Sequence, residues 1–317
     1  MAPLDPLLDD LNDAQREAVL HGDGPLLIHA GAGTGKTRVL TRRVGHLVRD
    51  RGIDPERILA VTFTNKAARE MKDRVGLDSR AWVMTFHSFC ARLLRIEGPP
   101  APRDAEFSIA DTADRRRAVK RILKEQDQDS SVFRPADAAA FIGRWKTMGR
   151  APRTVGADDW IEEVFLKVYV AYEEHLRRSN LLDFDDLLIE AVALLEGPRG
   201  ESWAQRFQHL LVDEYQDTNP LQYRITRALA ATHGNVTAVG DPDQSIYRWR
   251  GADIGNILNF EKDFPGATTL TLERNYRSTP AILAAAESLI EKNTERKAKR
   301  LWTEGEEGDP VHVESVG

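Results

Sequence analysis

The chain has 317 residues, a formal net charge of −6, a hydrophobic content of 41% and one cysteine. This composition supports hydrophobic cores in about two domains and excludes a disulfide framework, and no apolar run approaches membrane-spanning length. We therefore expect a cytoplasmic protein with no membrane partner, in which any nucleic-acid site would be a local positive groove.

Residues 26–30 form the first predicted strand, and a glycine-rich turn leads from them into a helix with one apolar face. This order of strand, glycine-rich turn and helix is typical of a phosphate-binding site, because backbone N–H groups converge on an anion at a helix N-terminus. Lys36 would reach the outer phosphates, and the Thr37 hydroxyl would ligate Mg²⁺. A strict motif has glycine where Ala30 stands, and a turn that binds nothing is the alternative interpretation. The predicted nucleotide contacts here are Ala30, Gly31, Ala32, Gly33, Thr34, Gly35, Lys36, Thr37 and Arg38.

Two more strands are predicted at residues 58–63 and 81–85, and Cys90 after them is expected to be a small buried side chain. From about residue 99 to 179 no segment is predicted as a strand, so we expect an all-helical insertion. Its basic helix around residues 115–121 would contact a nucleic-acid backbone or, as is commoner for a charged face, simply be solvated. A long helix there has an apolar face made of Trp160, Ile161, Val164, Phe165, Val168, Tyr169 and Tyr172.

The next predicted strand, residues 209–213, runs into two carboxylates. Asp213 would hold the metal, and Glu214, also a candidate metal contact, would orient and deprotonate an attacking water. A surface acidic turn is the alternative, but it does not explain why three apolar residues lead straight into the acids. The glycine-rich loop alone would also suit a kinase or a transporter subunit; Gln216 and the segments that follow argue against both.

A strand at residues 236–240 delivers the next polar segment to its carboxyl end, where ligands gather in open α/β sheets. Gln244 is predicted to sense the γ-phosphate. Tyr247 and Trp249, interleaved with arginines that include Arg250, have the composition of a base-stacking platform, with a buried aromatic cluster as the alternative. With a last strand at residues 268–272, the pattern predicts a parallel sheet covered by helices on both faces.

Together these segments resemble the amino-terminal part of a superfamily 1 DNA helicase of the UvrD/PcrA/Rep kind. The resemblance covers nearly the whole chain. Besides the phosphate loop and the acidic pair, the matching motifs are Leu11-Asn12-Asp13-Ala14-Gln15, Val61-Thr62-Phe63-Thr64-Asn65-Lys66-Ala67-Ala68, Thr85-Phe86-His87-Ser88, Phe184-Asp185-Asp186-Leu187-Leu188 and Leu272-Glu273-Arg274-Asn275-Tyr276-Arg277-Ser278. The segment 184–188 receives no role.

The resemblance implies an ATP site completed by Gln15, which would hydrogen-bond the adenine, and by Tyr276, which would stack on it. Arg277 would reach the γ-phosphate, and such an arginine is worth on the order of 10³–10⁵ in rate. With Glu214, Lys36 and Gln244 it makes the predicted catalytic set, and ATP and Mg²⁺ are the predicted cofactors.

The resemblance also implies contacts to DNA. The predicted DNA-binding residues are Phe63, Asn65, His87, Tyr247, Trp249 and Arg250. Taken without the family, Phe63 would be assigned to the core and His87 to a structural role. The implied activity is an ATP-dependent helicase that translocates 3′ to 5′ on single-stranded DNA. Its substrates would include junctions of single- and double-stranded DNA, and its pathway would be repair or replication, with repair proteins as candidate partners.

The predicted organisation is a RecA-like α/β lobe of the P-loop NTPase class over residues 1–98 and 180–280, with the all-helical insertion at 99–179. Residues 281–317 would begin a second, truncated lobe whose opening strand is Asp309–Glu314, so we expect a fragment of a longer helicase. Two alternatives remain open: a module that binds ATP and DNA without turnover, and the motor part of a helicase–nuclease.

Overall fold

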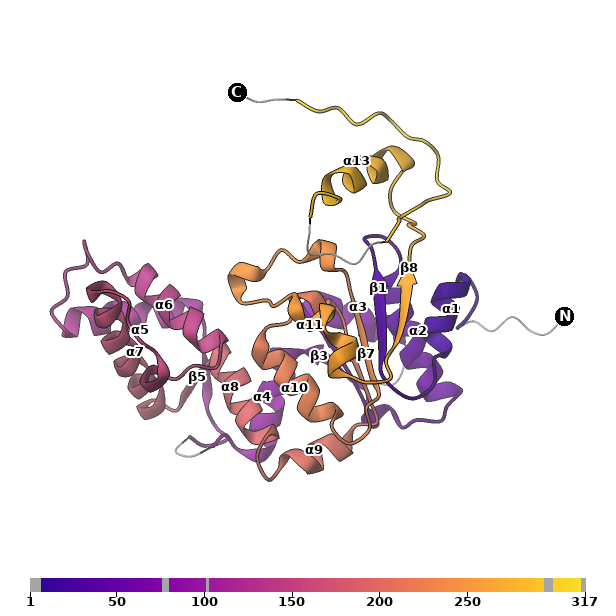
Figure 1. Cartoon of the computed structure of the whole chain (residues 1–317). Helices are drawn as coiled ribbons and strands as arrows, with labels where there is room; N and C mark the ends of the chain where they lie inside the picture. Colours follow the sequence, from indigo (N-terminus) through magenta and orange to yellow (C-terminus); the bar gives the residue numbers. More distant parts are fainter. Residues whose placement is uncertain (1–6, 76–79, 101–102, 294–298, 315–317) are drawn as a thin grey trace.

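The computed structural model describes residues 7–75, 80–100, 103–293 and 299–314 (Figure 1). Within them, six strands form one parallel sheet in the order β3-β2-β6-β7-β1-β8. These strands are β1 Leu26–Ala30, β2 Ile58–Thr62, β3 Trp82–Thr85, β6 His209–Val212, β7 Val236–Gly240 and β8 Thr268–Leu272. Each coincides with a predicted strand, so the prediction of a parallel, RecA-like α/β sheet is confirmed.

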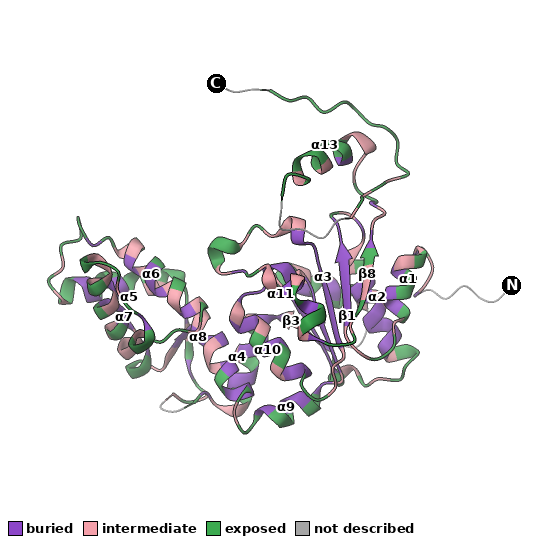
Figure 2. Cartoon of the chain, viewed as in Figure 1, coloured by how far each residue is buried: buried purple, intermediate pink, exposed green. Residues whose placement is uncertain are grey.

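Helices cover both faces of this sheet. Successive side chains of a strand point to opposite faces, and in β1 Leu27 packs into one core cluster while Leu26 and Ile28 pack into another. The first cluster includes α4 Phe86–Glu97, α8 Phe184–Leu195, α9 Gly200–Arg206, α10 Pro220–Ala230, α11 Gly255–Leu258 and α12 Phe260–Asp263. The second includes α1 Asp13–Leu20, α2 Lys36–Arg49 and α3 Asn65–Val75. Strands β1, β2, β6 and β7 are buried along their whole length (Figure 2).

The insertion packs around its own core, at one side of the lobe in Figure 1. Its helices are α5 Thr112–Glu125, α6 Pro135–Thr147 and α7 Trp160–Arg178. The expectation of no strand between residues 99 and 179 is wrong: β4 Ser108–Ala110 pairs in parallel with β5 Leu181–Asp183. Three residues are too few to show an alternating pattern, which explains the error.

The proposed apolar face of α7 is also wrong at its first residue. Trp160 is 60% exposed, and its ring meets that of Phe133 edge to face, with ring centres 5.5 Å apart. Phe165 and Tyr172 further along the helix are buried as predicted. Cys90 is buried too, as expected.

Beyond β8 the chain forms α13 Pro280–Ile290, which lies away from the sheet in Figure 1. The predicted opening strand at Asp309–Glu314 pairs with nothing among the described residues and is exposed. Short 3₁₀ turns occur at η1 Pro55–Arg57, η2 Pro152–Thr154, η3 Tyr215–Asp217, η4 Pro242–Gln244 and η5 Arg248–Arg250. In the described ranges, no helix combines the length and the apolar character needed to cross a membrane.

Candidate functional site

The turn between β1 and α2 has the geometry of a phosphate-binding loop. Gly33 and Gly35 have φ angles of 71° and 92°, which L side chains rarely adopt. A Cβ on Gly33 would also lie 2.7 Å from the Cβ of Arg277, so a larger residue does not fit there. No side chain of the described residues caps the N-terminus of α2, so its first N–H groups are available to an anion. The predicted loop is formed, and Arg277 lies beside it.

The two predicted acids lie next to this loop. Asp213 directly follows β6, and its backbone N–H donates to the carbonyl oxygen of Val61 at 2.9 Å. Glu214 has a φ of 48°, uncommon for a residue other than glycine, and its Oε2 lies 2.7 Å from Nζ of Lys36. The fold thus joins a lysine and a carboxylate that are 178 positions apart in the sequence. A backbone held in such a conformation is typical of functional sites.

The electrostatics of this corner favour an added cation. Burial, and then the negative charge of Glu214, raise the pKa of Asp213 to about 7. Thr37 lies in the first turn of α2, at the loop. The described residues contain no group of three or more His, Cys, Asp and Glu side chains that could hold a metal. Asp213 and Thr37 offer oxygen ligands, which suit Mg²⁺, an ion that commonly takes one or two protein oxygens and completes its shell with phosphate and water.

A hydrogen-bonded path runs from Glu214 to the next strand. The Gln216 side chain donates through Nε2 to Oε2 of Glu214 at 2.9 Å and accepts at Oε1 from the backbone N–H of Asp241 at 3.0 Å. Asp241 in turn accepts at Oδ2 from Nε2 of Gln244, at 2.6 Å. A Cβ on Gly240 would lie 2.5 Å from Oε1 of Gln216, so the close approach needs glycine. The sequence did not predict this linking role for Gln216 or Asp241, because no motif spacing indicates it.

The predicted adenine contacts lie on the other side of the loop. Gln15 is fully buried; its Nε2 donates to the carbonyl oxygen of Thr34 at 2.8 Å, and its Oε1 accepts from the backbone N–H of Asn12 at 3.2 Å. Tyr276 is 46% exposed, accepts from Nδ2 of Asn12 at 2.9 Å and has the guanidinium of Arg38 6.0 Å from its ring centre. Gln15 and Tyr276 are therefore brought together by Asn12, while their adenine roles stay predictions.

Four of the predicted DNA-binding residues form one aromatic and basic surface. The rings of Phe63 and Tyr247 stack with centres 5.1 Å apart and planes at 27°. The Arg250 guanidinium lies 4.7 Å from the ring centre of Trp249 and 5.5 Å from that of Tyr247. Trp249 is 74% exposed, so the alternative of a buried aromatic cluster is wrong for it. Asn65, exposed at the start of α3, follows Phe63 closely in the chain.

His87, the remaining predicted DNA-binding residue, lies in the first turn of α4. Its ring meets that of Phe184 edge to face, with ring centres 5.8 Å apart. Burial lowers the pKa of His87, although the charge of Asp185 opposes this. His87 therefore lies against the segment 184–188, for which the sequence suggested no role.

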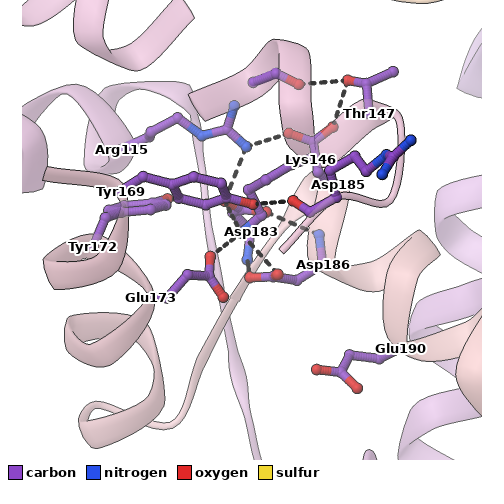
Figure 3. A network of polar contacts seen from close by, with 12 residues as sticks. Arg115, Lys146, Thr147, Tyr169, Tyr172, Glu173, Asp183, Asp185, Asp186 and Glu190 are labelled. Carbon is purple, nitrogen blue, oxygen red and sulfur yellow. Dashed lines mark hydrogen bonds and ion pairs between the residues drawn. The ribbon is translucent and has the colours of Figure 1, made fainter. Parts of the chain in front are cut away.

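That segment begins α8 and holds the insertion to the lobe (Figure 3). Nζ of Lys146, fully buried at the end of α6, lies 2.9 Å from Asp183 and 2.7 Å from Asp186. Arg115 of α5 pairs with both Asp183 and Asp185. Against the effect of burial, the charges of Lys146 and Arg115 lower the pKa of Asp183. Arg115 belongs to the predicted basic helix, but here it is an internal ion-pair partner.

Comparisons with known proteins agree with this geometry. Residues 11–265 match the family model described as the UvrD/REP helicase N-terminal domain, and residues 270–317 match the UvrD-like helicase C-terminal domain. The ATP-dependent DNA helicase PcrA of Bacillus subtilis is 47% identical over 312 residues, covering 95% of this chain and 42% of that protein. The PcrA helicases of Leuconostoc citreum and Staphylococcus aureus Mu50 are each 45% identical over 318 residues. They are covered over 42% and 44% of their lengths, so the chain spans less than half of these relatives.

Proposed function

Because the chain belongs to the UvrD/REP helicase family, we propose that it carries the ATP-binding lobe of an ATP-dependent DNA helicase. The observation that supports this most is the ion pair of 2.7 Å between Lys36 of the phosphate loop and Glu214. It supports the proposal because it joins Lys36, the proposed phosphate-binding cation, to Glu214, the proposed general base. The exposed aromatic surface of Trp249 and its neighbours supplies the second requirement, a track for unpaired bases.

In this proposal Lys36 changes partner when ATP binds. In the structure its ammonium donates to Oε2 of Glu214. The outer phosphates carry more negative charge than one carboxylate, so they draw Lys36 away and release Glu214 to orient and deprotonate the attacking water. Arg277, beside Gly33, stabilises charge on the transferred phosphoryl group. Gln15 and Tyr276 hold the adenine.

Thr37 and Asp213, with Glu214 nearby, would hold Mg²⁺, which neutralises phosphate charge. Asp213 is suited to this because it is buried beside another carboxylate, and burial and the charge of Glu214 together outweigh the opposing charge of Lys36. The ammonium of Lys36 and the carboxylate of Glu214 add one positive and one negative charge to the same site.

Coupling to DNA follows the path from Glu214 through Gln216 to Asp241 and Gln244. Tyr247 lies three residues beyond Gln244, so a shift of η4 on nucleotide binding moves its ring relative to Phe63. Bases held by these rings would advance along the track. The remaining DNA contacts are proposed at Asn65, His87, Trp249 and Arg250.

We extend the proposal to the whole protein as the family suggests. Translocation would run 3′ to 5′ on single-stranded DNA, with junctions as substrates and repair or replication as the setting, and with repair proteins as candidate partners in the cytoplasm. The lobe would comprise residues 1–98 and 180–280, the insertion 99–179, and residues 281–317 the start of a second lobe.

The test is ATP hydrolysis by the full-length gene product, measured with and without an oligo-dT strand. The proposal predicts turnover that rises with strand concentration and saturates, and that depends on Mg²⁺. Nucleotide and strand binding without stimulated turnover would instead define a binding module and refute the helicase assignment for this protein.

A further inference from the structure

After α13 the chain returns to the edge of the phosphate-binding loop. Trp302 pairs with Arg274 as an isolated parallel bridge. Its carbonyl oxygen accepts from the backbone N–H of Asn275 at 2.7 Å, and its N–H donates to the carbonyl oxygen of Glu273 at 3.1 Å. Leu301 lies over the loop itself, since a Cβ on Gly31 would come within 2.5 Å of its side chain. The region matched to the UvrD-like C-terminal domain therefore contacts the ATP-binding loop directly.

Lys299 is the charged residue of this contact. Its Nζ lies 2.5 Å from Oδ1 of Asp241 and 2.5 Å from Oδ2 of Asp243, and the three side chains are 5%, 3% and 9% exposed. Two carboxylates buried so close together repel each other unless a cation lies between them. The lysine thus places a positive charge between these two carboxylates.

The two oxygens of Asp241 serve different partners. Oδ1 faces Lys299 and also accepts from the backbone N–H of Asp243 at 3.0 Å, and Oδ2 accepts from Nε2 of Gln244 at 2.6 Å. The contacts with Lys299 and with the backbone N–H of Asp243 fix the rotation of the carboxylate, so the Gln244 amide nitrogen stays turned toward Asp241 and its oxygen away. Without the ammonium, Asp241 would lose its charged partner and be held less firmly, and Gln244 would lose part of its fixed orientation.

We propose that Lys299 is a positioning residue: it orients Gln244 through Asp241 and so ties the γ-phosphate sensor to the start of the C-terminal region. The proposal rests on the proposed ATPase function. In this arrangement the orientation of the Gln244 side chain depends on the position of the segment from Lys299 to Trp302. The contact of Lys299 therefore links the two regions that match the family models.

The test uses Lys299→Met, Lys299→Arg and the control Lys292→Met, whose lysine is exposed near the end of α13, in the full-length gene product. Dissociation constants for ATPγS and ADP are measured with kcat and KM of strand-stimulated hydrolysis, and melting curves check the fold. Lys299→Met should lower kcat and ATPγS affinity about tenfold and leave ADP affinity within about twofold, since only the γ-phosphate contact is lost. Lys299→Arg should recover most of both, because it keeps the charge.

A double-mutant cycle separates positioning from general support of the fold. If Lys299 acts through Gln244, Lys299→Met should have little further effect on kcat in a Gln244→Ala background. The proposal would be overturned if Lys299→Met weakened ATPγS and ADP binding equally, or if the effects in the cycle were additive. It would also be overturned if Lys299→Met tightened nucleotide binding and raised turnover. Wild-type protein that binds no ATPγS would refute the proposed function itself, a failure visible before any variant is compared.

Discussion

Replacing Lys146 by methionine tests how the insertion is held to the ATP-binding lobe. The ammonium of Lys146 lies 2.7 Å from Glu173, 2.9 Å from Asp183 and 2.7 Å from Asp186, and the lysine is fully buried (Figure 3). Methionine has nearly the same length and helix propensity, so the change removes the charge and little else. Asp183 would then keep the guanidinium of Arg115, and Asp186 that of Arg103 at 3.9 Å, while the three carboxylates would lose their shared ammonium.

Removing one partner from a buried ion pair costs about 3–5 kcal/mol, because the opposite charge is left without compensation. Part of this cost is recovered by protonation. Burial raises the pKa of Asp186 even in the intact network, where Lys146 opposes the shift. In the variant the opposition is gone, so the folded pKa lies still further above the unfolded value. We expect a loss of about 3 kcal/mol in the free energy of unfolding at neutral pH.

The assay is urea denaturation followed by circular dichroism and tryptophan fluorescence, at pH 5 and pH 8. A carboxyl whose folded pKa is raised loses stability as pH rises through that value, so the deficit of Lys146→Met should be larger at pH 8 than at pH 5. The control is Lys167→Met, at an exposed position of α7 in the same subdomain. A deficit below about 1 kcal/mol, or one that is equal at both pH values, would refute the role assigned to Lys146.

Three further predictions concern the site and the sheet. Glu214→Gln should retain ATP binding and abolish strand-stimulated turnover; turnover at the wild-type rate would show that another group serves as the base. Trp249→Ala should weaken strand affinity by about 1–3 kcal/mol with ATP binding intact, whereas Trp160→Ala, at a comparably exposed tryptophan, should leave the strand titration unchanged. Burial, with help from Arg43, lowers the pKa of His209 to about 4, so the fold loses stability as pH falls from about 6.5 toward 4; His209→Gln should flatten that loss in acid denaturation curves, and an unchanged slope would contradict it.

Most of the sheet was predictable because β1, β2, β6 and β7 are short, mainly apolar runs that become wholly buried. The run Leu210-Leu211-Val212 before Asp213 is an example: burial on both faces of a parallel sheet favours continuous apolar residues, and the polar His209 at the start of this strand is buried as well. The meeting of Lys36 and Glu214 also followed, since parallel strands deliver their carboxyl ends to one edge. β4 could not be found this way, because a pair of three-residue strands is set by packing and not by periodicity.

The polar network of the insertion and the contact of Lys299 were beyond prediction for another reason. Lys146 and Asp183 are 37 positions apart, and Lys299 and Asp241 are 58 apart, so neither pair shares a local pattern. Such pairs depend on how whole elements pack, and only the folded chain shows that a basic residue such as Arg115 faces inward. Trp249 is similar, because composition suggested a stacking surface but only the fold shows its 74% exposure.

The central claim is that Mg²⁺-dependent triphosphate binding takes place where Lys36 meets Glu214. Equilibrium titration of the full-length gene product with ATPγS and Mg²⁺ tests it most directly, with Lys36→Ala as the comparison. We expect saturable binding by the wild-type protein and affinity at least about tenfold lower for the variant, since a charge-assisted phosphate contact is lost. Equal affinities, or no binding by the wild type, would contradict it.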